Sequence, residues 1–167
     1  MNKLYYAGIG SRETPNSILT IMTKTAHELE NNGWILRSGG AKGADQAFER
    51  GVSDKSHKEI FYANSAIPKS YIIASKYHPS WQYLSDYVQS LHARNVMQVL
   101  GKDLETPVEF VICWTPDGVE EGNKTTRKTG GTGQAIRIAS GYGISIINLK
   151  NNNSLNRILE IINKYKK

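Results

Sequence analysis

Three short segments of the sequence combine glycines with basic side chains, which is the composition of a phosphate-binding site. They run from Gly8 to Arg12, from Ser38 to Lys42, and up to Gly130–Gly133 after a basic stretch. Glycine lets an anion approach the backbone N–H groups at a helix start, and lysine or arginine neutralises its charge. Each segment could instead be a packing turn, but three in one chain favour a phosphate site. The candidate ligand-binding residues here are Gly8, Gly10, Ser11, Arg12, Ser38, Gly39, Gly40, Ala41, Lys42, Asp45, Gly130, Gly131, Thr132 and Gly133.

Common cofactor and metal motifs do not occur in the sequence. The six-residue dinucleotide pattern Gly-x-Gly-x-x-Gly and the Walker ending Gly-Lys-Ser/Thr are both missing. The histidines, His27, His57, His78 and His92, are dispersed and show no zinc spacing. We therefore expect neither a cofactor nor a metal ion.

A helical stretch near residue 95 offers side chains that could line the same pocket. At about 100° per residue, Arg94, Asn95 and Gln98 share a narrow face of an otherwise apolar helix. Such a helix is expected to be buried, so its polar stripe should line a pocket. The alternative is that the stripe faces solvent. Trp114, at the end of the most apolar strand, is the best candidate for stacking on a base. Four other aromatic residues could stack on a base or form a core or dimer face: Tyr77, Trp81, Tyr83 and Tyr87.

Few residues have the character of a catalytic group. Asp45 could cap a helix or bind a ribose hydroxyl, and the sequence does not favour either role over the other. Three acids between residues 116 and 129 could reach the pocket, although keeping a loop soluble is the simpler role: Asp117, Glu120 and Glu121. Cys113 lies in an apolar run and is expected to be a core thiol. We predict no catalytic residue.

The pattern of apolar runs predicts an α/β fold. Expected strands span 4–7, 34–36, 60–63, 108–114 and 144–148; expected helices span 14–30, 44–51, 91–100, 131–140 and about 155–162. The stretch 64–90 is hard to assign, and 116–129 is expected to be a mobile loop or lid. Strands that alternate with helices predict a Rossmann-like open, mostly parallel sheet with helices on both faces, formed by one domain spanning 1–167.

The composition of the chain indicates the environment and the kind of partner. It has 167 residues, 39% of them hydrophobic, a single cysteine and a formal net charge of +6. One cysteine excludes a disulfide framework, so a reducing cytoplasm is expected, and no apolar stretch approaches the length of a membrane span. The first ten residues also lack the apolar core of a signal peptide. The positive charge favours an anionic partner.

Four segments, in order, resemble motifs of the SMF/DprA–LOG superfamily, called SLOG, and of its DprA-like branch in particular. "GIGSRETP" resembles the family's Gly-Ser-Arg loop after strand one, and "RSGGAKGADQAFERG" resembles its Ser-Gly-Gly-Ala-x-Gly-Ile-Asp segment, with Ala44 in place of Ile. "LHARNVMQVLG" is similar to its Arg-Asn helix start, and "TGGTGQAIRIA" to its Ser-Gly-Thr segment. The resemblance covers residues 4 to 148.

The resemblance implies a Rossmann-like fold with a pocket for nucleotide or nucleic-acid phosphates. DprA proteins bind single-stranded DNA. The LOG branch hydrolyses the base–ribose bond with a Pro-Gly-Gly-x-Gly-Thr-x-x-Glu motif, and here Arg137 stands where that glutamate would be. Other SLOG domains sense ADP-ribose-type signals, and small standalone relatives look like phage proteins. The resemblance therefore implies a bacterial or phage-infected cytoplasm as the expected location.

These expectations combine into one leading prediction and two alternatives. The leading prediction is a protein that binds a small nucleotide, such as an ADP-ribose or cyclic ADP-ribose signal, as a sponge or sensor without chemistry. The alternatives are DprA-like binding of single-stranded DNA and LOG-like hydrolysis of a nucleotide. A homo-oligomer and no membrane contact are expected in each case.

Overall fold

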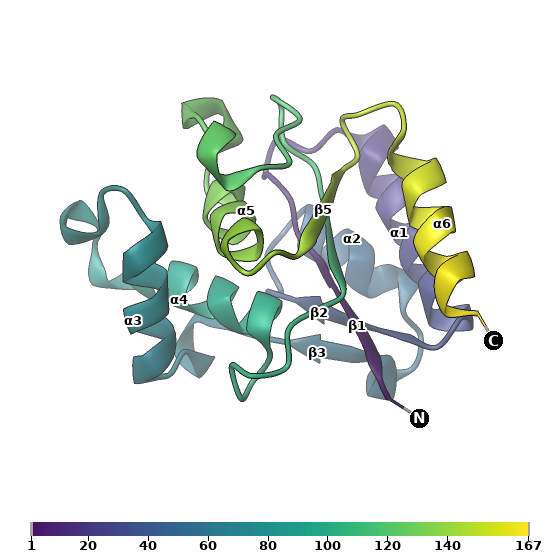
Figure 1. Cartoon of the computed structure of the whole chain (residues 1–167), viewed down its shortest axis with the longest axis horizontal. Coiled ribbons are helices and arrows are strands. Elements are labelled where there is room, and N and C mark those ends of the chain that lie inside the picture. Colours follow the sequence, from purple (N-terminus) through teal and green to yellow (C-terminus); the bar gives the residue numbers. More distant parts are fainter. Residues whose placement is uncertain (1, 167) are drawn as a thin grey trace.

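The computed structural model describes residues 2–166 and contains a five-stranded sheet in which neighbouring strands are all parallel (Figure 1). The strands are β1 (Leu4–Gly8), β2 (Trp34–Ser38), β3 (Lys58–Ile60), β4 (Phe110–Cys113) and β5 (Ser145–Asn148). Their spatial order is β3-β2-β1-β4-β5. This is the order of a Rossmann-like open sheet, so the predicted fold class is confirmed.

Helices cover both faces of the sheet. They are α1 (Asn16–Asn31), α2 (Ala44–Gly51), α3 (Pro68–Tyr77), α4 (Asp86–Leu100), α5 (Thr132–Gly141) and α6 (Ser154–Tyr165). One core cluster unites Met22, Phe48 and Ile158 from α1, α2 and α6. The other contains residues of α3, α4 and α5, and Figure 1 shows these helices on the opposite side of the sheet.

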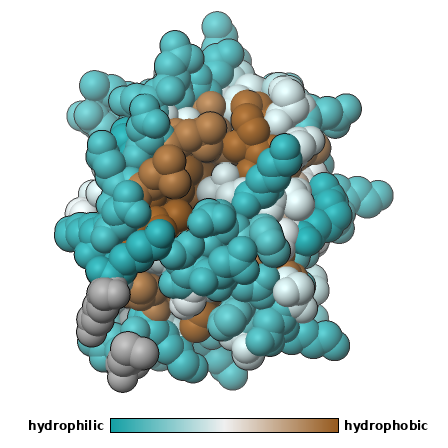
Figure 2. Space-filling model, turned by 90° about the vertical axis from the view of Figure 1, so that its right-hand side faces the viewer, coloured by the Kyte–Doolittle hydropathy of each residue, from teal (hydrophilic) through white to brown (hydrophobic). Residues whose placement is uncertain are grey.

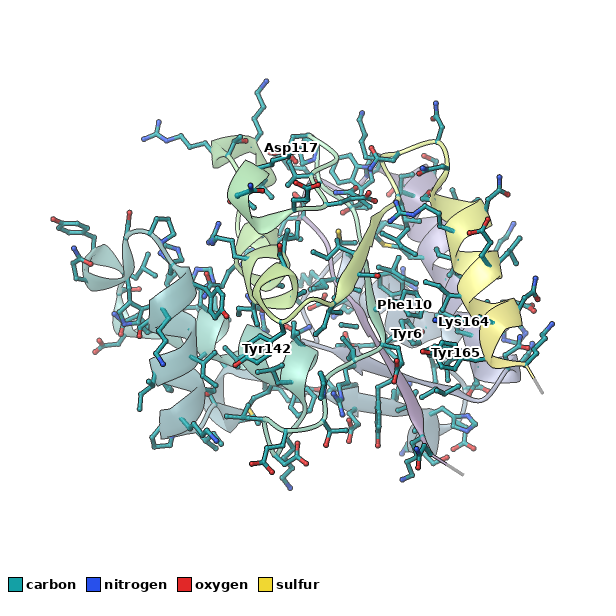
Figure 3. The ribbon with its side chains drawn as sticks, in the orientation of Figure 1. Tyr6, Phe110, Asp117, Tyr142, Lys164 and Tyr165 are labelled. Carbon is teal, nitrogen blue, oxygen red and sulfur yellow. The ribbon has the colours of Figure 1, made fainter. Side chains whose placement is uncertain are left out.

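The central strands are buried because they are covered on both faces. Every residue of β2 and β4 is buried, as expected for parallel strands between two helical layers. Tyr6 of β1 stacks on Phe110 of β4 with ring centroids 5.9 Å apart, and both residues are labelled in Figure 3. The Trp34 ring meets the same Phe110 edge-on at 5.2 Å. These aromatic contacts tie β1, β2 and β4 together beneath α1 and α6.

The structure differs from the sequence-based assignment at several element boundaries. The unassigned stretch contains α3, whose apolar pattern is masked by serines and tyrosines. Helix α4 begins well before residue 91, because the side chain of Ser85 accepts a hydrogen bond from the Val88 N–H and caps it. Thr14 does not cap α1: Pro15 is the N-cap, and the Thr14 hydroxyl donates to the Ser11 carbonyl instead.

The segment between β4 and α5 is tied down by hydrogen bonds, in contrast to the mobile lid that its polarity predicts. The carboxylate of Asp117 accepts hydrogen bonds from the hydroxyls of Thr115, Thr126 and Thr129 at 2.5–3.0 Å. Three such bonds lower the pKa of Asp117 even though partial burial opposes the shift. Asp117 therefore holds both ends of the segment together.

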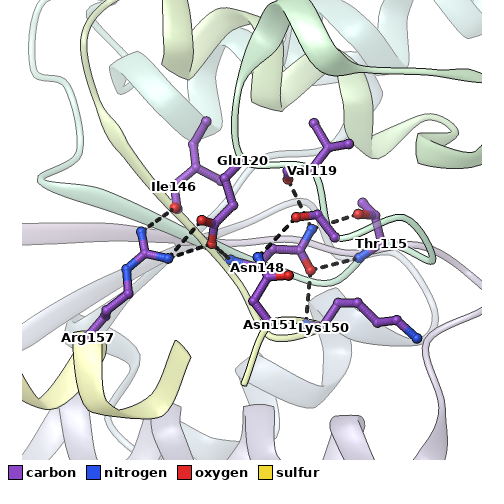
Figure 4. A network of polar contacts seen from close by, with 9 residues as sticks. Thr115, Val119, Glu120, Ile146, Asn148, Lys150, Asn151 and Arg157 are labelled. Atoms are coloured by element: carbon purple, nitrogen blue, oxygen red, sulfur yellow. Dashed lines mark hydrogen bonds and ion pairs between the residues drawn. The ribbon is translucent and has the colours of Figure 1, made fainter. Parts of the chain in front are cut away.

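Glu120 anchors the same segment to the body of the protein (Figure 4). Its carboxylate accepts hydrogen bonds from the Asn148 N–H at 2.7 Å and from the Arg157 guanidinium at 2.7 and 2.8 Å. The side chain of Asn148 in turn donates to the Thr115 hydroxyl and the Val119 carbonyl. Asp117 and Glu120 therefore have structural partners, and neither is free to reach the pocket as a catalytic acid.

An apolar surface band lies on the side of the molecule that carries α1 and α6 (Figure 2). Leu155 and Leu159 of α6 are about half exposed there. No helix in the described part of the chain is long and apolar enough to cross a membrane. The predicted homo-oligomer is not tested by the single chain and stays a prediction.

Candidate functional site

A cleft of about 1420 Å³ opens at the carboxyl ends of β1, β2 and β4. The chain leaves β1 toward α1 on one face of the sheet and leaves β4 toward α5 on the other. Because β1 and β4 are neighbours, their loops diverge and leave a crevice between them, which is where open α/β sheets bind ligands. We call the three contributing segments the β1 loop (residues 9–15), the β2 loop (39–43) and the β4 loop (114–131).

Most of the residues selected from the sequence meet at this cleft. Those that line it are Gly10, Ser11, Arg12, Gly39, Gly40, Ala41, Lys42, Asp45, Arg94, Asn95, Gly130, Gly131 and Thr132. They come from segments up to 122 positions apart, from Gly10 to Thr132, and the order of the strands brings these segments to the same edge of the sheet. The exposed basic side chains of Arg127 and Lys128 also line the cleft, whereas Lys124 forms an ion pair with Glu121 at 3.3 Å.

Four of the selected residues lie outside the lining of the cleft. Trp114 is only 6% exposed and packs in the core cluster beneath α1 and α6, so it is not placed to stack on a base. Ser38 is fully buried and donates a hydrogen bond to Glu49 at 2.7 Å. Gly8 and Gly133 are buried beside Phe48 and Thr129, respectively.

The protein's own side chains pack closely against the glycines of the β1 and β2 loops, so these positions have no room for a larger residue. A methyl group on Gly10 would lie 2.6 Å from the Ala44 methyl. One on Gly39 would lie 2.8 Å from an Asp45 carboxylate oxygen and 2.9 Å from the Arg94 guanidinium carbon. One on Gly40, which has a φ of +70°, would lie 2.7 Å from the Tyr62 ring. Packing therefore accounts for these glycines without a phosphate.

The glycines at the end of the β4 loop face open space. A methyl group on Gly130 or Gly131 would meet no atom within 4 Å, and both residues are exposed at the mouth of the cleft. Gly131 directly precedes α5. The Gly133 and Gln134 N–H groups donate to the Gly130 and Gly131 carbonyls, whereas the N–H groups of Gly131 and Thr132 have no partner among the described residues. The partial positive charge of a helix start favours an anion here. Of the three predicted phosphate loops, the β4 loop has the geometry best suited to one.

The β2 loop carries a negative group of its own. The Asp45 carboxylate accepts a hydrogen bond from the Ala41 N–H at 3.2 Å and so closes the β2 loop; it does not cap α2, whose N-cap Gly43 has no side-chain hydrogen bond. Burial raises the pKa of Asp45 to about 6, although Arg94 and the Ala41 N–H act in the opposite direction. A carboxylate at this position opposes the binding of a phosphate to the same loop.

Arg94 is held in place by the loop that it faces. Its Nη1 donates to the Gly39 carbonyl at 2.8 Å, while its buried Nε has no partner among the described residues. Burial lowers the pKa of Arg94, and the neighbouring Asp45 counteracts this shift. Arg94 is therefore both a structural partner of the β2 loop and a donor with an unused N–H group at the cleft.

The polar stripe predicted on α4 faces the cleft only in part. Asn95 lines the cleft beside Arg94, but Gln98 lies deeper and is fully buried. Both amide atoms of Gln98 lack a partner among the described residues. His92, which also lines the cleft, is 9% exposed and has an unpartnered Nδ1. Burial lowers the pKa of His92 to about 4, aided by the nearby charges of His78 and two arginines.

Two exposed tyrosines were not singled out as the leading aromatic candidates by the sequence. Tyr62 and Tyr87 line the cleft and are 53% and 66% exposed. Tyr62 follows β3, which ends at Ile60, whereas the sequence placed Tyr62 inside an expected strand at 60–63 and therefore gave no signal for it. Tyr87 belongs to the aromatic group around residue 80, within which the sequence cannot separate it from Tyr77 or Tyr83.

Two arginines that lie close to the predicted loops in the sequence have structural roles instead of facing the cleft. Arg37, which flanks the β2 loop in sequence, is buried, pairs with Glu59 at 2.8 Å and lies over the Tyr5 ring at 4.0 Å. Arg137 donates hydrogen bonds to the Tyr77 carbonyl, the Thr125 hydroxyl and the Gln134 amide. Neither arginine lines the cleft.

The remaining reactive groups offer little chemistry. Cys113 is fully buried, as expected for a core thiol, and burial raises its pKa. Within residues 2–166, no three His, Cys, Asp or Glu side chains are grouped so that they could hold a metal ion. The acids that line the cleft are Glu13 and Asp45. Comparisons of the chain with protein-family models, with curated proteins and with solved structures found no match.

Proposed function

We propose that this protein binds a small nucleotide through its phosphates and releases it unchanged. The observation that carries the proposal is the open start of α5, where Gly130 and Gly131 leave room for an anion beside the N–H groups of Gly131 and Thr132, which have no hydrogen-bond partner among the described residues. An ADP-ribose-type signal, held by a sponge or a sensor, is the ligand class that the SLOG resemblance suggests.

The charges around the cleft support an anionic ligand. The exposed side chains of Arg12, Lys42, Arg127 and Lys128 line it together with the partly buried Arg94. Only two acids oppose them, and one of these has its pKa raised by burial. The cleft therefore has an excess of positive charge, which concentrates anions near it.

Binding without cleavage is supported by what surrounds α5. Breaking a base–ribose bond develops positive charge on the sugar, which a carboxylate stabilises. Arg137 stands at the position of the LOG glutamate and is fully engaged by Tyr77, Thr125 and Gln134. Two acids of the β4 loop, Asp117 and Glu120, are held by structural hydrogen bonds.

Gly131→Ala tests the proposal directly. Gly131 has a φ of −61° and open space around it, so alanine fits and the stability should change by no more than about 1 kcal/mol. The added methyl group lies where a phosphate would approach the N–H groups, so calorimetry should show at least a tenfold loss of nucleotide affinity. Ser140→Ala, at the exposed far end of α5, is the control and should bind normally. Unchanged binding by Gly131→Ala would exclude the start of α5 as the phosphate site.

Single-stranded DNA is the second candidate ligand, favoured by the size of the cleft and by its exposed tyrosines. Its volume of about 1420 Å³ exceeds that of an ordinary small-molecule pocket. Tyr62 and Tyr87 could stack on bases while Arg127 and Lys128 contact the backbone. Titrations at several salt concentrations separate the two ligands, because strand affinity falls steeply with salt and the affinity of a small nucleotide does so far less.

A further inference from the structure

Asp45 offers the cleft a carboxylate oxygen that the protein itself does not use. The residue lines the cleft although it is only 5% exposed. Its Oδ2 accepts the Ala41 N–H at 3.2 Å, whereas no described residue donates to Oδ1, and this oxygen is not sealed from the cleft. An ionised carboxylate can only accept hydrogen bonds. Oδ1 is therefore ready to accept one from a ligand.

Arg94 offers hydrogen-bond donors beside this carboxylate. Its Nη1 donates to the Gly39 carbonyl at 2.8 Å, which fixes the guanidinium group. Its Nη2 has no partner among the described residues and, unlike the buried Nε, stays accessible. A methyl group on Gly39 would lie 2.8 Å from Oδ2 of Asp45 and 2.9 Å from Cζ of Arg94, so the two charged groups flank the same glycine. The cleft therefore presents an acceptor and a donor side by side.

The opposite charges of this pair select the kind of group that binds between them. A phosphate would meet the carboxylate of Asp45, and an ammonium group would meet the guanidinium of Arg94. A hydroxyl is neutral, donates one hydrogen bond and accepts others, so it can satisfy both side chains at once. Burial has removed most of the water from Asp45 and raises its pKa to about 6, so a ligand donor would replace lost hydration.

We propose that Asp45 and Arg94 together bind a ribose hydroxyl of the nucleotide, with Asp45 accepting from its O–H and Arg94 donating to its oxygen. A nucleotide has hydrogen-bond donors in two places, the ribose hydroxyls and the amino group of the base. Only a hydroxyl donates and accepts through the same atom, as a carboxylate and a guanidinium that flank one glycine require. This assignment rests on the nucleotide-binding function proposed above.

Calorimetry with ADP, 2′-deoxy-ADP, 3′-deoxy-ADP and inosine diphosphate tests the assignment. Wild-type protein should bind ADP about tenfold more tightly than at least one deoxy analogue, because a hydrogen bond to a charged group is lost. This comparison needs no variant.

Asp45→Asn then identifies the acceptor. Its oxygen can still accept the Ala41 N–H, but its NH₂ group replaces the free carboxylate oxygen, so the ratio of the ADP and deoxy-ADP affinities should fall to about one. The ratio is the readout, because removing a negative charge strengthens the binding of every anionic probe. Glu13→Gln removes a negative charge from an exposed residue of the same cleft and is the matched control, so it should keep the wild-type ratio.

The opposite results separate an incorrect hydroxyl site from an incorrect function. Equal wild-type affinities for ADP and both deoxy analogues would overturn the hydroxyl site while nucleotide binding stands. A ratio that survives in Asp45→Asn, or that is lost in Glu13→Gln, would place the ribose elsewhere in the cleft. If Asp45→Asn abolishes only the discrimination against inosine diphosphate, which lacks the amino group, Asp45 contacts the base and the ribose assignment is wrong. If wild-type protein binds none of the four nucleotides, both the hydroxyl site and the proposed function are wrong.

Discussion

The buried carboxyl of Asp45 should make the stability of the protein depend on pH, and Asp45→Asn tests this. Burial raises its pKa from 3.8 to about 6. A carboxyl whose pKa is higher in the folded state holds its proton more tightly there, so its contribution is fully present below the unfolded pKa. The contribution is lost as the pH rises through about 6. A shift of about two pKa units corresponds to about 3 kcal/mol of unfolding free energy.

The assay is urea unfolding of wild-type protein and Asp45→Asn between about pH 4 and about pH 8, followed by circular dichroism. Asparagine keeps an oxygen that can accept the Ala41 N–H but has no charge to bury. The stability of the variant relative to wild type should therefore rise by about 2 kcal/mol across this range. Glu160→Gln, an exposed acid on α6, is the control and should show no such trend.

The result that would refute this reasoning is a difference between Asp45→Asn and wild type that is flat with pH or falls as the pH rises. Either outcome would mean that the Arg94 charge and the Ala41 N–H outweigh burial. Asp45 would then be an ionised partner of Arg94 throughout this range, with a pKa at or below its ordinary value.

Three further substitutions test the contacts around the site. Arg94→Ala should lower the unfolding free energy by about 1–3 kcal/mol. The loss should be larger at high pH than at low pH, because ionised Asp45 then lacks its compensating charge. A loss that does not change with pH in urea titrations would contradict this. Gly39→Ala should destabilise the free protein by about 1–3 kcal/mol, because its methyl group would overlap Asp45 and Arg94; an unchanged melting temperature would show that the loop adjusts freely. Glu120→Ala should cost about 1–3 kcal/mol and speed proteolysis of the β4 loop, because Arg157 and the β5 backbone lose their acceptor; unchanged cleavage in a timed digest would mean that the loop does not need this anchor.

The fold class followed from the sequence because the signals for it are local. Parallel strands covered on both faces are continuous apolar runs, and 108–114 shows this around Phe110–Cys113. Helices α1, α2 and α5 were placed from periodicity and from the glycines and prolines near their ends. Helix α3 was missed because the serines and tyrosines of Pro68–Tyr77 give no strong period, and its packing against α4 and α5 compensates for that.

The candidate site could be predicted as a set of segments but not as a geometry. Glycines after strands must lie at the carboxyl edge of a parallel sheet, so the sequence alone located all three loops there. Which glycine faces a ligand depends instead on what fills the space beside it. At Gly39 that space is taken by Arg94, 55 positions further along the chain, whereas at Gly131 nothing fills it. Trp114 was expected as the last residue of its strand and lies directly after β4, where the tertiary packing turns its ring into the core beneath α1 and α6. Local sequence patterns indicate which residues are buried and which form turns. The side-chain contacts that open or close a cleft are made by residues far apart in the chain, so local patterns do not predict them.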